Sequence, residues 1–119
     1  MYKYRSLDAW KHAHAAILVT LRSTSSAPRD HWAVFDQLRR AAVSIEANIV
    51  EGYALGTVPL FRRHLRIAIG SAAEAECLVR LCGELGYLPA EVGKRLEQEL
   101  DATMGCIAGL MRKGVPQKA

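Results

Sequence analysis

The amino-acid sequence predicts an all-α protein, an antiparallel up-down-up-down four-helix bundle. Along four segments, apolar residues recur at steps of three and four, which is the period of a helix with one buried face. Only a few residues connect these segments, so consecutive helices must lie side by side and run in opposite directions. The chain of 119 residues is 50% hydrophobic, which suits one domain with its own core, and we assign residues 1–119 to that domain.

The first two helices are expected on either side of a serine-rich stretch that ends at Pro28. The first covers residues 7–22, with Ser6 as its N-cap. Its apolar positions are Leu7, Trp10, Ala13 or His14, Ile17, Leu18 and Leu21. The second covers about residues 30–54, with Asp30 as its N-cap. Its core positions are Phe35, Leu38, Ala42, Ile45, Ile49 and Gly52, flanked by a polar and small stripe of Gln37, Ala41, Ser44, Asn48 and Glu51.

The third helix covers residues 58–85, with Thr57 as its N-cap and Pro59 allowed in its first turn. Its core positions are Phe61, Leu65, Ala68, Ala72, Ala75, Val79 and Cys82. Gly86 is expected to end this helix as its C′ residue, and the fourth helix follows and ends near Gly114. The core positions of the fourth helix are Val92, Leu96, Leu100, Thr103, Ile107 and Leu110.

Residue patterns for catalysis or metal binding are missing from these helices. A di-iron bundle holds its metals with Glu-x-x-His pairs, because residues three apart share a face, and no glutamate in this chain is followed by histidine at that distance. His12 and His14 lie two apart and point to different sides of their helix. We therefore expect no catalytic residues, no metal, no cofactor and no small-molecule substrate, and we expect that the protein is not an enzyme.

The cysteine count and the hydropathy pattern favour a cytoplasmic location. Cys77, Cys82 and Cys106 are an odd number without zinc-like spacing, which is typical of a reduced protein whose thiols act as small buried apolar groups. The N-terminal residues lead into patterned sequence rather than an export signal, and no apolar stretch approaches the ~20 residues that span a bilayer. We expect no membrane association.

Basic residues gather at one end of the predicted bundle. In an up-down-up-down bundle, the first and third helices start at the end where the second and fourth finish. This end collects eight basic residues: Lys3, Arg5, Arg62, Arg63, Arg66, Arg112, Lys113 and Lys118. Asp8 and Glu51 are its acidic residues, so its local charge of about +6 exceeds the +4 of the whole chain. Two interpretations stay open: this end binds nucleic-acid phosphates without strong sequence preference, or its arginines pair with carboxylates of a neighbouring subunit or stay solvated.

Two further pairs of polar residues have a structural interpretation beside a functional one. Arg39 and Arg40 can contact nucleic acid or a partner, or they can form ion pairs such as Asp36 with Arg40, four residues apart on one helix. Asn48 and Glu51 lie one turn apart beside the core face. We expect both to be buried or half-buried, with the Glu51 carboxylate paired or bonded to backbone, because a buried carboxylate requires a partner.

Apolar and aromatic residues of the first two helices favour self-association. Trp10 and Trp32 are expected to pack in the core or in an interface rather than to stack on bases. Val34, Val43 and Val50 form a second apolar stripe that would face water in a monomer. Either this stripe is covered in a closed homo-oligomer, or it merely widens the core face.

Several stretches resemble a known bacterial family in the order in which they occur. They are Leu7-Asp8-Ala9-Trp10, the segment from Gln37 to Gly52, Ala68-Ile69-Gly70-Ser71 with Glu74, and Leu85-Gly86-Tyr87-Leu88. From about Tyr4 to Lys113 the chain resembles the four-helix-bundle family named after proteins encoded in intervening sequences of 23S ribosomal RNA genes. One departure is Glu46-Ala47, where the family often has a proline, so the second helix should be straighter here.

The resemblance implies a small cytosolic bundle that assembles as a ring-like homopentamer. Related proteins include the accessory subunit of diversity-generating retroelements, which binds nucleic acid and a reverse transcriptase. On this basis we expect a homo-oligomeric adaptor that binds RNA, DNA or a nucleic-acid enzyme. The alternative is a purely structural or protein-interaction bundle with no nucleic-acid role.

Overall fold

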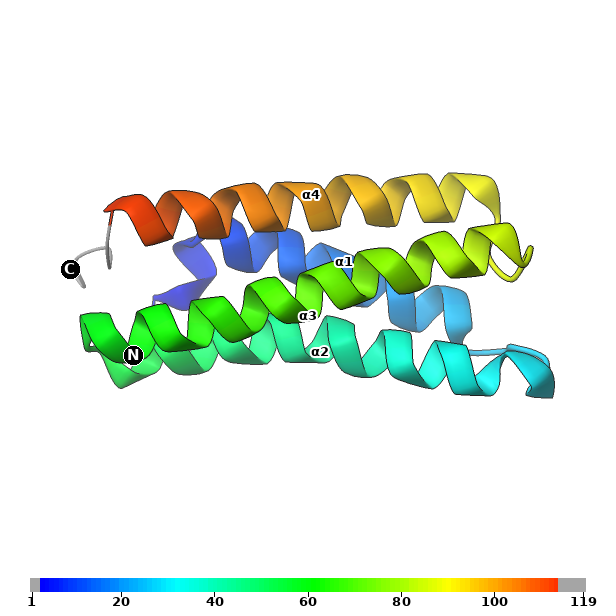
Figure 1. Ribbon diagram of the computed structural model, residues 1–119, viewed down its shortest axis with the longest axis horizontal. Helices are drawn as coiled ribbons and strands as arrows, with labels where there is room; N and C mark the ends of the chain where they lie inside the picture. The colour runs from blue at the N-terminus through cyan, green and yellow to red at the C-terminus, as the bar shows by residue number, and fades with distance from the viewer. Residues whose placement is uncertain (1–2, 114–119) are drawn as a thin grey trace.

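Four long helices make up most of the computed structural model, which describes residues 3–113 (Figure 1). They are α1 (Asp8–Thr24), α2 (Trp32–Leu55), α3 (Val58–Glu84) and α4 (Ala90–Lys113). Two single-turn 3-10 helices, η1 (Tyr4–Ser6) and η2 (Arg29–His31), precede α1 and α2. Consecutive helices run in opposite directions, and no strand occurs among residues 3–113, which confirms the predicted four-helix bundle.

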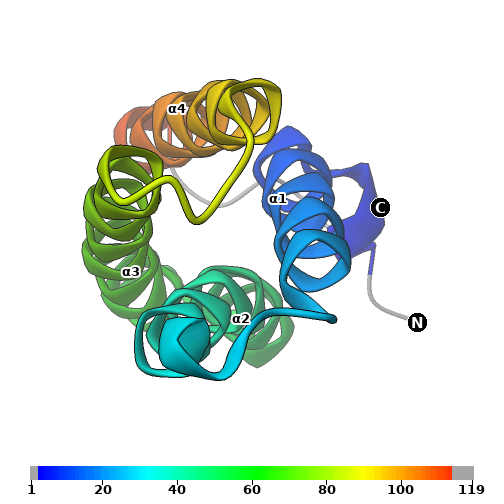
Figure 2. The same cartoon turned by 90° about the vertical axis from the view of Figure 1, so that its right-hand side faces the viewer.

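The four helices stand at the corners of a square when viewed along the bundle (Figure 2). Helix α1 packs on α2 and α4, and helix α3 packs on the same two neighbours. Helices α1 and α3 therefore occupy opposite corners, and their backbones do not approach each other closely. The described part measures 45 × 21 × 20 Å, and its long axis matches the 27 residues of α3 at 1.5 Å per residue.

The core faces predicted for α2, α3 and α4 are confirmed. Every predicted core position of α2 and α3 is buried. On α4 the two outermost positions, Val92 and Leu110, are half-buried, and the four positions between them are buried. The apolar residues thus point inward, and within residues 3–113 no helix has the length and apolar character needed to cross a membrane.

The apolar face predicted for α1 is wrong. The core face of α1 consists of small residues: Ala9, Ala13, Ala16, Thr20 and Thr24. Of the expected positions only Leu7 and Ala13 are fully buried, and Leu18 and Leu21 are 36% and 42% exposed. Both stripes have helical spacing, so periodicity could not decide between them. The bundle buries the small stripe because alanines let α1 approach both of its neighbours closely.

Two of the predicted N-caps are also wrong. Ser6 lies in η1, where its hydroxyl donates to the Lys3 carbonyl at 2.7 Å, and Leu7 takes the N-cap position of α1 without a side-chain bond. Asp30 lies inside η2, and α2 begins after His31. In both places a 3-10 turn precedes the α-helix and delays its first residue.

The predicted ends of α3 are confirmed. The Thr57 hydroxyl accepts the amide of Leu60 at 3.4 Å, which caps the helix at its start. Gly86 has a φ of +72°, a left-handed conformation that glycine adopts without a Cβ clash. The amide of Tyr87 donates across this turn to the Cys82 carbonyl at 2.8 Å, which is the long bond of a Schellman motif.

Polar side chains set the register between α2 and α3. The hydroxyls of Ser44 and Ser71 lie 2.8 Å apart, and His64 Nδ1 donates to Asn48 Oδ1 at 2.9 Å. Two residues of the polar stripe predicted beside the core face of α2, Ser44 and Asn48, therefore lie at the edge of the α2–α3 contact. Helix α2 continues unbroken through Glu46-Ala47, where this sequence has no proline.

Gly52 lies where α2 passes close to α3. A Cβ added at this position would lie 2.6 Å from the Cβ of His64 and 3.2 Å from Cδ1 of Phe61. We expect Gly52→Ala to lower the free energy of unfolding by about 1–3 kcal/mol, because one helix must move to admit the methyl group.

The matched control for Gly52→Ala is Gly105→Ala on the exposed side of α4, where an added Cβ meets no atom within 4 Å. It should raise the free energy of unfolding by roughly 0.5–1 kcal/mol through helix propensity alone. Urea unfolding of the two variants measures both changes. A Gly52→Ala variant as stable as the Gly105→Ala variant would show that the helices do not pass as closely as described.

Candidate nucleic-acid interface

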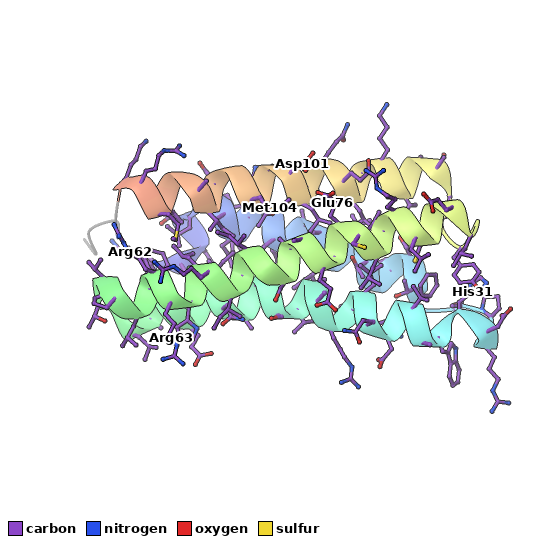
Figure 3. All side chains as sticks on the ribbon, in the orientation of Figure 1. His31, Arg62, Arg63, Glu76, Asp101 and Met104 are labelled. Carbon is purple, nitrogen blue, oxygen red and sulfur yellow. The ribbon has the colours of Figure 1, made fainter. Side chains whose placement is uncertain are left out.

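One end of the bundle carries the basic residues that the sequence predicted there. The helices α1 and α3 start at this end and α4 finishes at it (Figure 1). We call it the basic end, and its described basic residues are Lys3, Arg5, Arg62, Arg63, Arg66, Arg112 and Lys113. Figure 3 shows Arg62 and Arg63 at this end and His31 at the opposite one. Lys118, which was also predicted to belong here, lies outside the described residues.

All seven side chains of the basic end are exposed. On α3 the buried residues Phe61 and Leu65 occupy the core face, so Arg62, Arg63 and Arg66 project outward as predicted. Within residues 3–113, no basic side chain of this end forms an ion pair or a hydrogen bond. Their donors are therefore available to an anionic partner.

The acidic residues near the basic end do not neutralise it. Asp8 lies 3.8 Å from Lys11, on the same helix, in a pair whose side chains are mostly exposed. Glu51 is exposed on α2, so its predicted burial is wrong. Asn48, one turn earlier, is half-buried as predicted, because it faces His64 while Glu51 points away from the α2–α3 contact. An exposed carboxylate needs no partner, since water solvates it.

A surface pocket of about 400 Å³ opens at the basic end between the start of α1 and the end of α4. Asp8, Cys106 and Lys113 line it together with apolar atoms and backbone. Burial, and after it the Asp8 carboxylate, raises the pKa of the Cys106 thiol above its ordinary value. A raised pKa keeps the thiol protonated at neutral pH, which is the opposite of an activated cysteine nucleophile.

The other two cysteines differ in environment. Cys82 is buried in the core face of α3 as predicted, and burial raises the pKa of its thiol. Cys77 is exposed, so its predicted burial is wrong. It lies on the outer side of α3, five residues before Cys82, where the helix turns the side chain away from the core.

The histidines lie in contacts between helices. His12 Nδ1 donates to Glu99 Oε1 of α4 at 2.8 Å. The ring of His31 stacks on Tyr87, with the two ring centroids 3.6 Å apart, at the end opposite the basic end (Figure 3). Among residues 3–113, no group of three or more His, Cys, Asp or Glu side chains is placed to hold a metal ion.

Arg39 and Arg40 both bond within the chain. Arg40 Nε lies 3.1 Å from Asp36 Oδ2, which confirms the predicted ion pair one turn apart on α2. Arg39 Nε donates to the Thr24 hydroxyl at 2.8 Å, and its guanidinium also reaches the Thr24 carbonyl. Arg39 thus supplies donors to the last turn of α1, whose carbonyls lack partners within the helix. Neither arginine is as free as those of the basic end.

Glu46 joins α1 to α2 through two contacts that the sequence did not predict. Trp10 Nε1 donates to Glu46 Oε2 at 3.2 Å, and His14 Nδ1 donates to Glu46 Oε1 at 3.0 Å. The rings of Trp10 and His14 stack with centroids 4.7 Å apart. In the sequence, Glu46 stood out only because it lies where the family often has a proline. That difference predicted a straighter helix and gave no information about the partners of Glu46.

The two tryptophans fall in different places. Trp10 is half-buried and packs against the core, as predicted. Trp32 is 58% exposed at the start of α2, so it does not pack in the core of its own chain. Trp32 was predicted to pack in the core or in an interface, and this exposed position is compatible only with the interface.

We expect Glu46→Ala to lower the free energy of unfolding by about 1–2 kcal/mol, because Trp10 and His14 lose their acceptor in a partly buried site. Glu97→Ala is the matched control, since Glu97 is an exposed glutamate that pairs with no other described residue. The control should change the value by less than about 0.5 kcal/mol. Urea unfolding measures both, and equal values would show that Glu46 does not anchor α1.

The comparisons with known proteins agree with this architecture. The family model described as "23S rRNA-intervening sequence protein" matches residues 5–109, which is most of the chain and includes α1, α2, α3 and most of α4. Among curated proteins, none matches the chain. On the strength of the family match and of the four-helix bundle described above, the chain belongs to the 23S rRNA-intervening sequence protein family.

Proposed function

We propose that this protein is a non-enzymatic cytoplasmic adaptor that assembles with copies of itself into a closed ring and binds RNA or DNA through its basic end. The observation that carries the proposal is the set of seven exposed basic side chains at one end, none of which is paired with another described residue. Five copies is the ring size expected from the family resemblance. A nucleic-acid enzyme is the other partner expected for the adaptor.

Phosphate binding suits the chemistry of the basic end. Five of its seven described basic residues are arginines, whose planar guanidinium groups match the geometry of phosphate oxygens. The residues project from the N-terminal segment, α3 and α4, and no bond within the described chain holds them in a fixed orientation, so they can neutralise a backbone without being fixed against particular base edges. In a ring, the basic ends of all copies lie on one face, and their fields add within a Debye length of about 8–10 Å.

Self-assembly has support in the apolar residues that one copy leaves in water. Val43 is 48% exposed on α2, and Val50, seven residues later, is half-buried. Of the two interpretations of the valine stripe, this exposure favours a stripe that another copy covers over one that widens the core face. Val34 is half-buried against the core, so it belongs to the core edge. Exposed apolar residues that recur along one helix are typical of a surface that another chain covers.

The second candidate function is an interaction bundle with no nucleic-acid role. The same exposed apolar residues favour it, because a bundle that only assembles needs them and does not need the basic end. In that case the arginines of the basic end pair with carboxylates of a neighbouring copy or stay solvated. The two functions differ in their response to charge reversal at the basic end.

We expect the double variant Arg62→Glu and Arg63→Glu to bind RNA and DNA more weakly than the natural protein. On duplex DNA the binding should depend less steeply on salt. The slope of log K against log salt concentration should become less negative by about 2, because each of the two lost phosphate contacts accounts for about 0.9 of the slope. Titrations at several salt concentrations measure the slope.

The matched control for this charge reversal is Arg80→Glu with Arg95→Glu, which reverses two exposed arginines away from the basic end. The control should bind with nearly the natural slope. Light scattering must first show that both double variants still assemble. Equal affinity and equal slope for the Arg62 and Arg63 variant and the natural protein would favour the interaction bundle.

Light scattering at micromolar concentration tests the self-assembly itself. We expect a single species of several times the chain mass of 13.1 kDa, with five times that mass as the expected value. A species of 13.1 kDa would contradict the ring, and two or more species in exchange would contradict a closed assembly of one size.

A further inference from the structure

Six of the ten exposed large apolar residues of the described chain fall on two separate faces, and the other four, Trp32, Leu55, Val58 and Leu85, lie at the ends of helices. The first face covers the outer side of α1 and its groove with α2, and we call it the α1/α2 face: exposed Leu18, Leu21 and Val43, with half-buried Ile17 and Val50. At its centre is a groove of about 420 Å³ that Ile17, Val43 and Val50 line. The second lies along α3, and we call it the α3 face: Leu60, Ile67 and Leu81.

The α3 face is a stripe along one side of its helix. Ile67 follows Leu60 by seven residues and Leu81 follows Ile67 by fourteen, so the three point in nearly the same direction. Val43 and Val50 on the α1/α2 face are also seven residues apart, and at 1.5 Å per residue both spacings measure about 10.5 Å. Each face therefore carries one pair of apolar side chains about 10.5 Å apart along its helix. On α3 the next position of the stripe is Glu74, whose carboxylate accepts a hydrogen bond from Gln37 of α2.

The two faces look out from different sides of the bundle. Helices α1 and α3 stand at opposite corners, as the end view shows (Figure 2). No residue of α4 is among the exposed large apolar residues of the described chain. The surface of α4 is thus suited to water, and the surfaces of α1, α2 and α3 are suited to contact.

At each end of the bundle, the two faces carry residues of opposite charge at similar heights. Near the basic end the α1/α2 face has Glu51, and the α3 face has Arg63 and Arg66. At the other end the α1/α2 face has Arg22, in the last turn of α1, and the α3 face has Glu84, the last residue of α3. Copies arranged around an axis parallel to the bundle stand at equal heights, so opposite charges would meet at both ends.

We propose that the α1/α2 face of one copy packs against the α3 face of the next copy in the ring. This inference rests on the self-assembly proposed above and names the surfaces that make it. When this head-to-tail contact repeats around an axis, it covers both apolar faces of every copy. The copies form a closed ring when the rotation from one copy to the next divides a full turn evenly. It also keeps every basic end on the same side of the ring.

The size of the surface allows two such contacts per copy. A stable interface buries about 800 Å² on each partner. The accessible surface of one copy is 6938 Å², so two interfaces would cover roughly a quarter of it. The elongated shape, 45 Å by about 20 Å, provides long faces for this purpose.

Two double variants test the pairing of unlike faces. Leu18→Glu with Leu21→Glu disables the α1/α2 face, and Ile67→Glu with Leu81→Glu disables the α3 face. All four residues are at least 36% exposed, so the helices should still fold, which circular dichroism checks. Lys94→Glu with Gln98→Glu, on exposed positions of α4, is the matched control and should assemble like the natural protein.

We expect each face variant to be monomeric alone, and an equimolar mixture of the two to form a dimer of twice the chain mass. In that dimer the one intact α1/α2 face meets the one intact α3 face. If instead like faces paired, each variant alone would dimerise through its remaining face and mixing would add nothing, which overturns the proposal. A face variant that assembles like the natural protein also overturns it.

A charge exchange between Arg22 and Glu84 provides a second test that needs no apolar substitution. Arg22 and Glu84 form no ion pair within the described chain, so the proposed pair is one between copies. Arg22→Glu alone and Glu84→Arg alone should each weaken assembly roughly three- to tenfold, and the double variant should restore it. Single variants that assemble normally, or a double variant weaker than either, would contradict the proposed register.

These tests presuppose that the natural protein assembles, which light scattering decides first. A natural protein of 13.1 kDa in solution contradicts the proposed ring and with it this inference. An assembled natural protein whose face variants also assemble contradicts the inference alone.

Discussion

Close approach of the helices through small side chains is the constraint on which this structure depends. The core face of α1 is a stripe of alanine and threonine, the middle of the α3 core face is alanine, and Gly52 lies directly against His64. Helices with such faces pack closely, and the space between them has little room for large side chains. The leucines of α1 therefore lie outside the core, although their spacing is helical. The apolar surface left exposed on α1 is a consequence of the same packing.

A narrow core also places polar contacts at the edges of the helix pairs. Glu46 links α1 to α2, Glu99 links α4 to His12 of α1, and Asn48 links α2 to His64 of α3. Each such bond contributes only about 0.5–1.5 kcal/mol of net stability, because water would satisfy the same groups in the unfolded chain. Their larger effect is on register, since a helix that slides or rotates by one residue loses its partner.

Charged residues divide into those that the fold uses and those that it leaves free. Arg39 bonds the last turn of α1, and Arg40 pairs with Asp36. The arginines of the basic end have no such bonds within the described chain, and the antiparallel topology gathers them from the N-terminal segment, α3 and α4. Free arginines at one end and apolar faces along the sides divide most of the surface by chemistry. The basic residues of α4 and of the N-terminal segment serve only the proposed phosphate contacts, whereas Arg63 and Arg66 lie both at the basic end and beside the proposed ring contact.

Features that depend on neighbours in the chain could be predicted from the sequence. These include the four helices, the core faces of α2, α3 and α4, and the ends of α3 at Thr57 and Gly86, because periodicity and capping are local properties. The basic end could be predicted too, since short connections leave one topology. The core face of α1 could not, because two stripes of equal period compete and the choice depends on how closely α2 and α4 approach. The partners of Glu46 could not either, since Trp10 and His14 lie more than thirty residues away in the chain and only the packing of α1 on α2 brings them together.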